Sequence, residues 1–277
     1  MKLIADSGST KTHWASVMPD GKCAHLYTEG LNPLTRSESE LIGILTSLRQ
    51  KLPCAPARIY FYGAGCRDEG RQYMYDCLRQ TFPEAATNMV VESDLLGAAR
   101  GALGHEAGIV GILGTGSNSG RYDGMRIIEN IPPLGFILGD EGSGVAMGRA
   151  LLNHVLRGRL KPTLLQSFCA KYPDADTNNV ISRVYRQPAA NTYMASFVPF
   201  LVENRKDAEI RDIIFHELKC YFQHQLSSYP DARKEPVAFV GGMAFALQEE
   251  LLEVAEEEGF RIRRILKEPM EGLVKFL

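Results

Sequence analysis

The sequence DSGSTKT at residues 6–12 has a counterpart, GTGSN, at residues 114–118. Each follows a short apolar run, Leu3–Ala5 or Gly108–Leu113, and so predicts a strand that turns tightly into a second strand. Glycine lets a ligand approach the backbone closely, and the exposed N–H groups and hydroxyls of such a turn suit phosphate oxygens. One turn in each half of the chain therefore predicts that a phosphate chain is bound from both sides of a cleft.

The composition is that of an ordinary globular protein with room for two domains. The chain has 277 residues, of which 45% are hydrophobic and 23% are charged. The net charge of −2 gives no reason to expect a nucleic acid or an anionic membrane as a partner. No apolar stretch is long enough to span a bilayer, and Asp6 comes too early for a signal peptide. We therefore expect a cytoplasmic protein.

The cysteines show no metal-binding pattern. None forms a CxxC pair or stands at zinc-ligand spacing with a histidine. Cysteines scattered through a chain of this length predict free thiols in a reducing compartment. The six are Cys23, Cys54, Cys66, Cys77, Cys169 and Cys220.

The first half predicts three consecutive strands followed by alternating helices and strands. Asp20-Gly21 marks a hairpin between the second and third strands, and Ser37 precedes an amphipathic helical run. The predicted strands are 2–6, 12–18, 22–28, 58–62 and 88–92, and the predicted helices are 38–51, 69–82 and 94–103.

The second half begins in the same way, with a glycine turn, an Asp123-Gly124 hairpin and a third strand. Because these signals recur together, internal duplication explains them better than chance similarity. The fold class is α/β, with a first domain at 1–104 and a second at 105–268. A mostly helical insertion occupies 145–230, a terminal helix at 269–277 packs back on the first domain, and Gly104 marks a hinge. The remaining predicted strands are 109–113, 119–123, 126–129, 237–240 and 260–266, and the remaining helices are 145–157 and 245–257.

The order of the motifs resembles that of the actin, Hsp70 and sugar-kinase superfamily. The acidic glycine turn is followed by Asn32, Asp94, the second glycine turn, GDEGSG at 139–144 and Gly241-Gly242. Within that superfamily the chain resembles the BadF/BadG/BcrA/BcrD-type ATPase family and its N-acetylglucosamine kinases, over nearly its whole length. The resemblance implies two RNase H-like domains of the actin/hexokinase type that face each other across a cleft.

The resemblance also implies a site for ATP and Mg²⁺. Asp6 would hold the metal through water, as the hydration preference of Mg²⁺ favours. An ordinary hairpin is the less favoured explanation of the first turn, whereas tight packing of a strand on a helix explains Gly241-Gly242 nearly as well as a nucleotide does. The sequence contains no GxxxxGK[ST], which excludes a P-loop. The implied nucleotide-binding residues are Gly8, Ser9, Thr10, Lys11, Gly114, Thr115, Gly116, Gly241 and Gly242.

A catalytic base and a sugar site follow from the same resemblance. Asp94 matches the general base that takes the proton of the attacking sugar hydroxyl, although Asp is also a favoured helix N-cap. The acidic pair at 140–141 would bind sugar hydroxyls, although acids are also favourable near a helix N-terminus. Leu34 and Leu134 stand where some N-acetylglucosamine kinases carry aromatic residues, which leaves the sugar open. The implied sugar-binding residues are Asn32, Ser117, Asn118, Asp140 and Glu141.

The expected function is therefore phosphorylation, by ATP, of a hydroxyl of an N-acetylglucosamine-like amino sugar or a related hexose. A homodimer is an open alternative to a monomer. The competing reading is an ATPase that activates a partner redox enzyme through an iron–sulfur cluster, but only Cys66 stands near the expected cleft. A sugar-responsive regulator would need a helix-turn-helix, for which there is no room before the first predicted strand.

Overall fold

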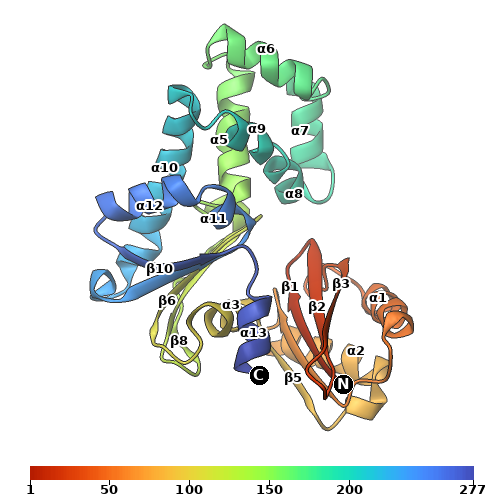
Figure 1. Cartoon of the computed structure of the whole chain (residues 1–277). Helices are drawn as coiled ribbons and strands as arrows, with labels where there is room; N and C mark the ends of the chain where they lie inside the picture. Colours follow the sequence, from red (N-terminus) through yellow and green to blue (C-terminus); the bar gives the residue numbers. More distant parts are fainter. The chain divides into compact units, whose positions relative to one another are not determined.

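The computed structural model describes residues 1–277 and divides them into two compact units (Figure 1). The first unit comprises 1–107, 122–127 and 268–277, and the second comprises 108–121 and 128–267. The structure contains two five-stranded sheets, which confirms the expected α/β class with one sheet from each half of the sequence. No helix combines the length and apolar character that crossing a membrane requires.

The first sheet has the strand order β3-β2-β1-β4-β5. The first three strands are antiparallel neighbours, whereas β1, β4 and β5 run parallel. This is the arrangement that the hairpin signal and the later strand–helix alternation predicted. The strands are β1 (Lys2–Ser7), β2 (Lys11–Val17), β3 (Cys23–Glu29), β4 (Arg58–Gly63) and β5 (Met89–Ser93).

Helices cover both faces of the first sheet (Figure 1). Residues such as Leu41 and Leu78 pack with Leu3 and Phe61 on the face that α1 and α2 cover. On the opposite face α13 packs against α3, and Gly272 lies against the Gly101 backbone. The helices are α1 (Glu38–Lys51), α2 (Asp68–Thr81), α3 (Asp94–Leu103) and α13 (Met270–Phe276), with a 3-10 turn at Pro83–Ala85.

The second sheet has the order β10-β9-β6-β7-β8. Read from its other edge, this order is β8-β7-β6-β9-β10. If the five strands of each half are numbered in chain order, both sheets therefore have the order 3-2-1-4-5, as the inferred duplication predicts. Parallel pairing joins β6 to β9 and β9 to β10. The strands are β6 (Gly108–Leu113), β7 (Ser117–Tyr122), β8 (Ile127–Glu129), β9 (Pro236–Val240) and β10 (Arg261–Leu266).

The chain between β8 and β9 is helical, with no strand. The single helix expected at 245–257 is wrong: the structure has α11 and α12, because Leu247 leaves helical geometry with φ −113° and ψ 32°. The helices are α4 (Gly135–Leu138), α5 (Gly144–Leu156), α6 (Pro162–Lys171), α7 (Thr177–Arg186), α8 (Ala190–Ala195), α9 (Val198–Glu203), α10 (Ala208–His224), α11 (Gly242–Ala246) and α12 (Gln248–Glu257), with 3-10 turns at Leu226–Ser228 and Ala232–Lys234.

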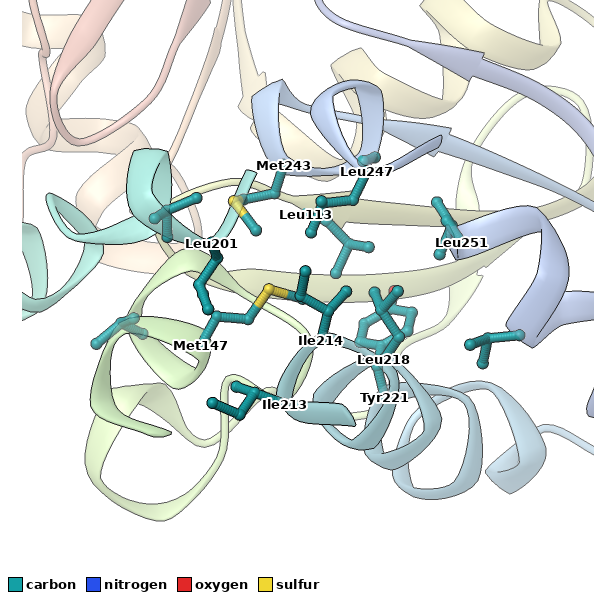
Figure 2. Packing of buried hydrophobic residues seen from close by; sticks show 14 of the residues in the cluster. Leu113, Met147, Leu201, Ile213, Ile214, Leu218, Tyr221, Met243, Leu247 and Leu251 are labelled. Atoms are coloured by element: carbon teal, nitrogen blue, oxygen red, sulfur yellow. The ribbon is translucent and has the colours of Figure 1, made fainter. Parts of the chain in front are cut away.

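The main core of the second unit surrounds the end of β6. Leu113, the last residue of that strand, lies among Met147 of α5, Ile214 of α10 and Met243 of α11 (Figure 2). All four side chains are at most 8% exposed. The strand end that carries the second glycine turn is thus embedded in tightly packed apolar side chains, which restricts how far the turn can move.

The contact between α3 and α13 gives a stability prediction. A Cβ at Gly272 would lie 1.8 Å from the Gly101 carbonyl oxygen, so Gly272→Ala should destabilise the protein by about 1–3 kcal/mol through overpacking. Helix propensity alone predicts the opposite sign. The control is Gly43→Ala in α1, where a Cβ meets nothing within 4 Å and should stabilise by about 0.5–1 kcal/mol. Urea unfolding measures both; a stabilised Gly272→Ala protein would contradict the close contact.

Candidate functional site

Three parallel strand ends meet at one edge of the first sheet. Ser7 of β1 pairs with Gly63 of β4, and Gly63 pairs with Ser93 of β5. The residues that follow these three therefore emerge side by side at the carboxyl edge, where ligands bind in open α/β sheets. This row of paired residues positions both the first glycine turn and Asp94.

The first glycine turn joins β1 to β2 and is held by backbone hydrogen bonds. The N–H of Gly8 donates to the Lys11 carbonyl at 2.9 Å, and the N–H of Gly30 donates to the Thr10 carbonyl at 3.0 Å. A Cβ at Gly30 would lie 2.4 Å from the Ser9 backbone, so only glycine fits beside the turn. At Gly8 the nearest atom would be 3.6 Å away, which leaves space for a ligand.

Asn32 connects the first turn to the loop after β4. Its Nδ2 donates to Ser9 Oγ at 3.1 Å, and its Oδ1 accepts from the Leu34 N–H at 2.9 Å. Oδ1 also lies where a Cβ of Gly65 would be, at 2.3 Å. The structure thus brings the expected sugar-binding asparagine to the expected phosphate turn.

Asp94 is the first residue of α3 but is not its N-cap. That position belongs to Ser93, whose Oγ accepts from the Leu96 N–H at 3.3 Å. Asp94 Oδ1 accepts from the adjacent Leu95 N–H at 2.8 Å. Burial raises the pKa of the Asp94 carboxyl, against the opposing effects of that N–H and of the Arg67 charge. Because Ser93 fills the N-cap position, capping does not explain the aspartate at position 94.

Asp6 stands among like charges. Burial, together with the charges of Asp94 and Glu268, raises its pKa from 3.8 to about 7, against the lowering effect of Lys11. Lys11 is the one positive charge that lowers the pKa of Asp6, so this carboxyl lacks enough positive charge nearby to favour its ionised form. A divalent cation would supply that charge, and carboxylate oxygens with water are the ligands that Mg²⁺ prefers. Asp6 therefore fits the expected role of holding Mg²⁺ through water, whereas no group of three or more His, Cys, Asp and Glu side chains is arranged to bind a metal ion directly.

The second glycine turn joins β6 to β7 and is fastened to the start of α5. The N–H of Gly144 donates to the Gly114 carbonyl at 2.8 Å, and the N–H of Val145 donates to the Thr115 carbonyl at 3.0 Å. A Cβ at Gly114 would meet nothing closer than 3.9 Å. As in the first unit, a rigidly held turn leaves open space at its leading glycine.

The expected acidic pair lies beside this second turn. Asp140 Oδ1 accepts from the Ser117 N–H at 3.4 Å, and a Cβ at Gly116 would lie 3.2 Å from Asp140 Oδ2. Burial raises the pKa of Asp140, opposed by the Ser117 hydrogen bond. Glu141 Oε1 lies 3.2 Å from His224 Nδ1. Since the first turn of α5 contains no acidic residue, interaction with the helix N-terminus does not explain the pair.

Asn118 is partly committed to the protein. Its Oδ1 accepts from the Ser119 N–H at 2.9 Å and from Asn130 Nδ2 at 3.0 Å. Its carbonyl accepts from the Tyr221 hydroxyl at 2.8 Å. Only its amide N–H₂ group is left to bind a sugar.

The two glycines at the end of β9 have different structural environments. A Cβ at Gly241 would lie 2.1 Å from the Leu113 carbonyl oxygen, and its φ of +133° also requires glycine. Around Gly242 a Cβ would meet nothing within 4 Å. Strand packing therefore explains Gly241, whereas Gly242 is open to a ligand and lies in the same unit as the second turn.

The structure adds one residue to the site that the sequence did not indicate. Glu268, which the sequence analysis missed, lies 2.6 Å from Lys11 Nζ; its only signal was its place two residues after β10.

Cys66, the candidate cluster ligand, is fully buried, and burial raises its pKa to about 12. A thiol that stays protonated is a poor metal ligand, and the structure has no metal-binding group of His, Cys, Asp and Glu side chains.

Comparison with known families agrees with this geometry. The profile of the BadF/BadG/BcrA/BcrD ATPase family matches residues 5–273, which is nearly the whole chain. The chain belongs to this family. No protein with a curated description matches the chain.

Solved structures extend the comparison. A candidate N-acetylglucosamine kinase from Porphyromonas gingivalis is 33% identical with a TM-score of 0.95, covering 100% of this chain and 98% of that one. Another candidate N-acetylglucosamine kinase, from Chromobacterium violaceum, is 20% identical with a TM-score of 0.75, covering 99% and 98%. A ROK family glucokinase from Streptomyces griseus, in complex with glucose and AMPPNP, is 14% identical with a TM-score of 0.58, covering 99% and 97%. The last two show a shared fold.

The raised pKa of Asp6 predicts a pH-dependent stability. Between pH 4 and 7 the native state holds a proton that the unfolded state has lost, so this carboxyl lowers the free energy of unfolding as the pH rises. Without metal, Asp6→Asn should match the wild type near pH 4 and exceed it above pH 7, by up to about 4 kcal/mol. Urea unfolding in a chelating buffer across this range measures the difference.

Exposed Glu69 in α2 provides the control, since Glu69→Gln should show no such trend. Excess Mg²⁺ should narrow the gap by stabilising the wild type more than Asp6→Asn. A difference between Asp6→Asn and the wild type that stays constant from pH 4 to 8 would mean that the Asp6 pKa is not raised.

Proposed function

We propose that this protein is an ATP-dependent kinase that phosphorylates a hydroxyl of an amino sugar of the N-acetylglucosamine type. The observation that carries the proposal is the pair of carboxylates, Asp6 and Asp94, at the carboxyl edge of the first sheet, with Ser93 already capping α3. The family and the 33% identical Porphyromonas gingivalis structure support the same reaction.

Asp94 serves as the general base. A sugar hydroxyl must lose its proton as it attacks the γ-phosphorus, and a carboxylate within hydrogen-bond reach accepts it. The raised pKa of Asp94 makes its carboxylate a stronger proton acceptor than an exposed aspartate. The Leu95 N–H holds one of its oxygens, which leaves the other to take the proton.

Backbone N–H groups bind the phosphates. The glycines of both turns, Gly8 and Gly114, have no side chain to block the approach of phosphate oxygens, and each turn is fixed by hydrogen bonds before the ligand arrives. Gly242 plays the corresponding part for the adenosine. Asp6 would hold Mg²⁺ through water, and the cation would supply positive charge to the phosphates.

Each unit offers side chains that suit a sugar hydroxyl. Asn32 is placed beside the first turn, and Asp140 and Glu141 beside the second. Carboxylates accept hydrogen bonds from hydroxyl groups, so the acidic pair favours a polyhydroxylated substrate over an anionic one. The iron–sulfur activator is less well supported, because the Cys66 thiol is buried and stays protonated.

The decisive experiment assays ATP-dependent phosphorylation of a panel of amino sugars and hexoses, with the sugar phosphate identified by ³¹P NMR. For the best substrate, Asp94→Asn should lower kcat by about 10²–10⁴-fold, because the base is lost, while nucleotide affinity is kept. The protein should not be destabilised, since Ser93 caps the helix and burial already disfavours the charged form of Asp94.

Ser93→Ala is the matched control. It should cost about 1 kcal/mol of stability through the lost cap and leave kcat nearly unchanged. An Asp94→Asn enzyme with full activity would remove the base assignment, and a wild type that phosphorylates no sugar on the panel would remove the proposed function.

A further inference from the structure

Glu268 bridges two basic side chains of the first unit. It follows β10 at the point where the chain returns to that unit. One carboxylate oxygen, Oε1, lies 2.6 Å from Lys11 Nζ, and the other, Oε2, lies 2.6 Å from His13 Nδ1. Both partners belong to β2, the strand that leaves the first glycine turn.

His13 gives this carboxylate a fixed anchor. The imidazole of His13 is nearly buried, its ring stacks on Tyr27 with centroids 4.5 Å apart, and its Nε2 lies 2.9 Å from His25 Nδ1. A ring held on three sides has little freedom to rotate. Glu268 is therefore held through one oxygen and presents the other to Lys11 in a defined place.

Lys11 is the more mobile partner. Its side chain is 53% exposed, and its ammonium group contacts Glu268 and lies 4.8 Å from the centre of the Tyr27 ring. Lysine loses much rotamer freedom when its ammonium is fixed. The ammonium has three N–H donors, so the contact with Glu268 leaves donors free for a further acceptor.

The charge balance supports a lasting contact. Burial of Glu268 would raise its pKa, but the hydrogen bonds and charges of Lys11 and His13 outweigh this and lower it. The carboxylate therefore stays ionised at neutral pH. Its ion pair with Lys11 joins the first phosphate turn to the segment just after β10, although 257 residues separate the two in sequence.

We propose that Glu268 is a positioning residue for the nucleotide: it holds the Lys11 ammonium at the first glycine turn before the phosphates arrive. This inference rests on the proposed function, in which Lys11 binds phosphate. The ordering of the lysine side chain then occurs during folding, and ATP binding does not have to supply it. Glu268 acts only through Lys11 and touches no reacting atom.

A double-mutant cycle tests the proposal, using calorimetric affinity for Mg-AMPPNP and KM for ATP. Lys11→Met should weaken nucleotide binding by roughly 10- to 100-fold, the range of a hydrogen bond to a charged group. Glu268→Ala should weaken it by up to about 10- to 30-fold, from the rotamer freedom that Lys11 regains. In the Lys11→Met background, Glu268→Ala should have no further effect. KM for the sugar should not change.

Two further variants keep the test sharp. Glu268→Gln preserves one acceptor oxygen and should fall between the wild type and Glu268→Ala. Glu271→Ala, an exposed glutamate of α13, should bind nucleotide like the wild type. If Glu268→Ala does not fold, Glu268→Gln takes its place in the cycle.

Three results would overturn the inference. Equal losses from Glu268→Ala with and without Lys11 would mean a purely structural role. Unchanged binding would mean that Lys11 is placed without Glu268, and tighter binding would mean that Glu268 competes with the phosphates for Lys11. Failure of the proposed function gives a different result: a wild type that binds Mg-AMPPNP but phosphorylates no sugar is not the proposed kinase, yet the cycle can still be measured by nucleotide binding. Normal binding by Lys11→Met would instead show that Lys11 does not bind phosphate.

Discussion

The structure depends above all on the register of the parallel strands. Because Ser7, Gly63 and Ser93 are paired in one row, the turn after β1 and the start of α3 emerge at the same height on the sheet. A slip of β1 by one residue would turn every side chain to the opposite face and move Asp6 into the apolar layer under α1 and α2. Burying an unpaired carboxylate there would be costly, so the hydrophobic pattern of the strand also fixes the site.

The same register concentrates negative charge. Asp94 and Glu268 both raise the pKa of Asp6, and Lys11 offsets only part of their effect. Without a ligand this repulsion lowers the free energy of unfolding, and the apolar packing of the sheet and its helices must more than offset it. Active sites commonly carry such costs, since groups arranged for a ligand repel one another without it. A bound cation and a substrate hydroxyl would relieve the repulsion.

Local signals were sufficient for most of the fold. The capping serine Ser37 predicted α1 at its observed bounds, and the hairpin and glycine turns predicted the three consecutive strands with which each half begins. The break at Leu247 could not be predicted, because no glycine or proline marks it. Nor could the sequence choose between Ser93 and Asp94 as the cap, since both are good caps and stand side by side. Glu268 was missed because its partners come from the opposite end of the chain, and only the folded topology brings them together.

The two units differ in the strands that lead into their glycine turns. At the strand position before the last residue, β1 carries Asp6 and β6 carries Ile112; at the last position, β1 carries Ser7 and β6 carries Leu113. Ser7 bonds to Thr12 and to the Leu31 N–H, whereas Leu113 lies in the apolar core among Met147, Ile214 and Met243. The first unit thus combines its turn with a carboxylate, and the second combines the same turn with an apolar anchor. Under the proposed function Asp6 is the carboxylate that holds the metal, and because β6 has no counterpart to it, the proposal assigns the metal to the first unit.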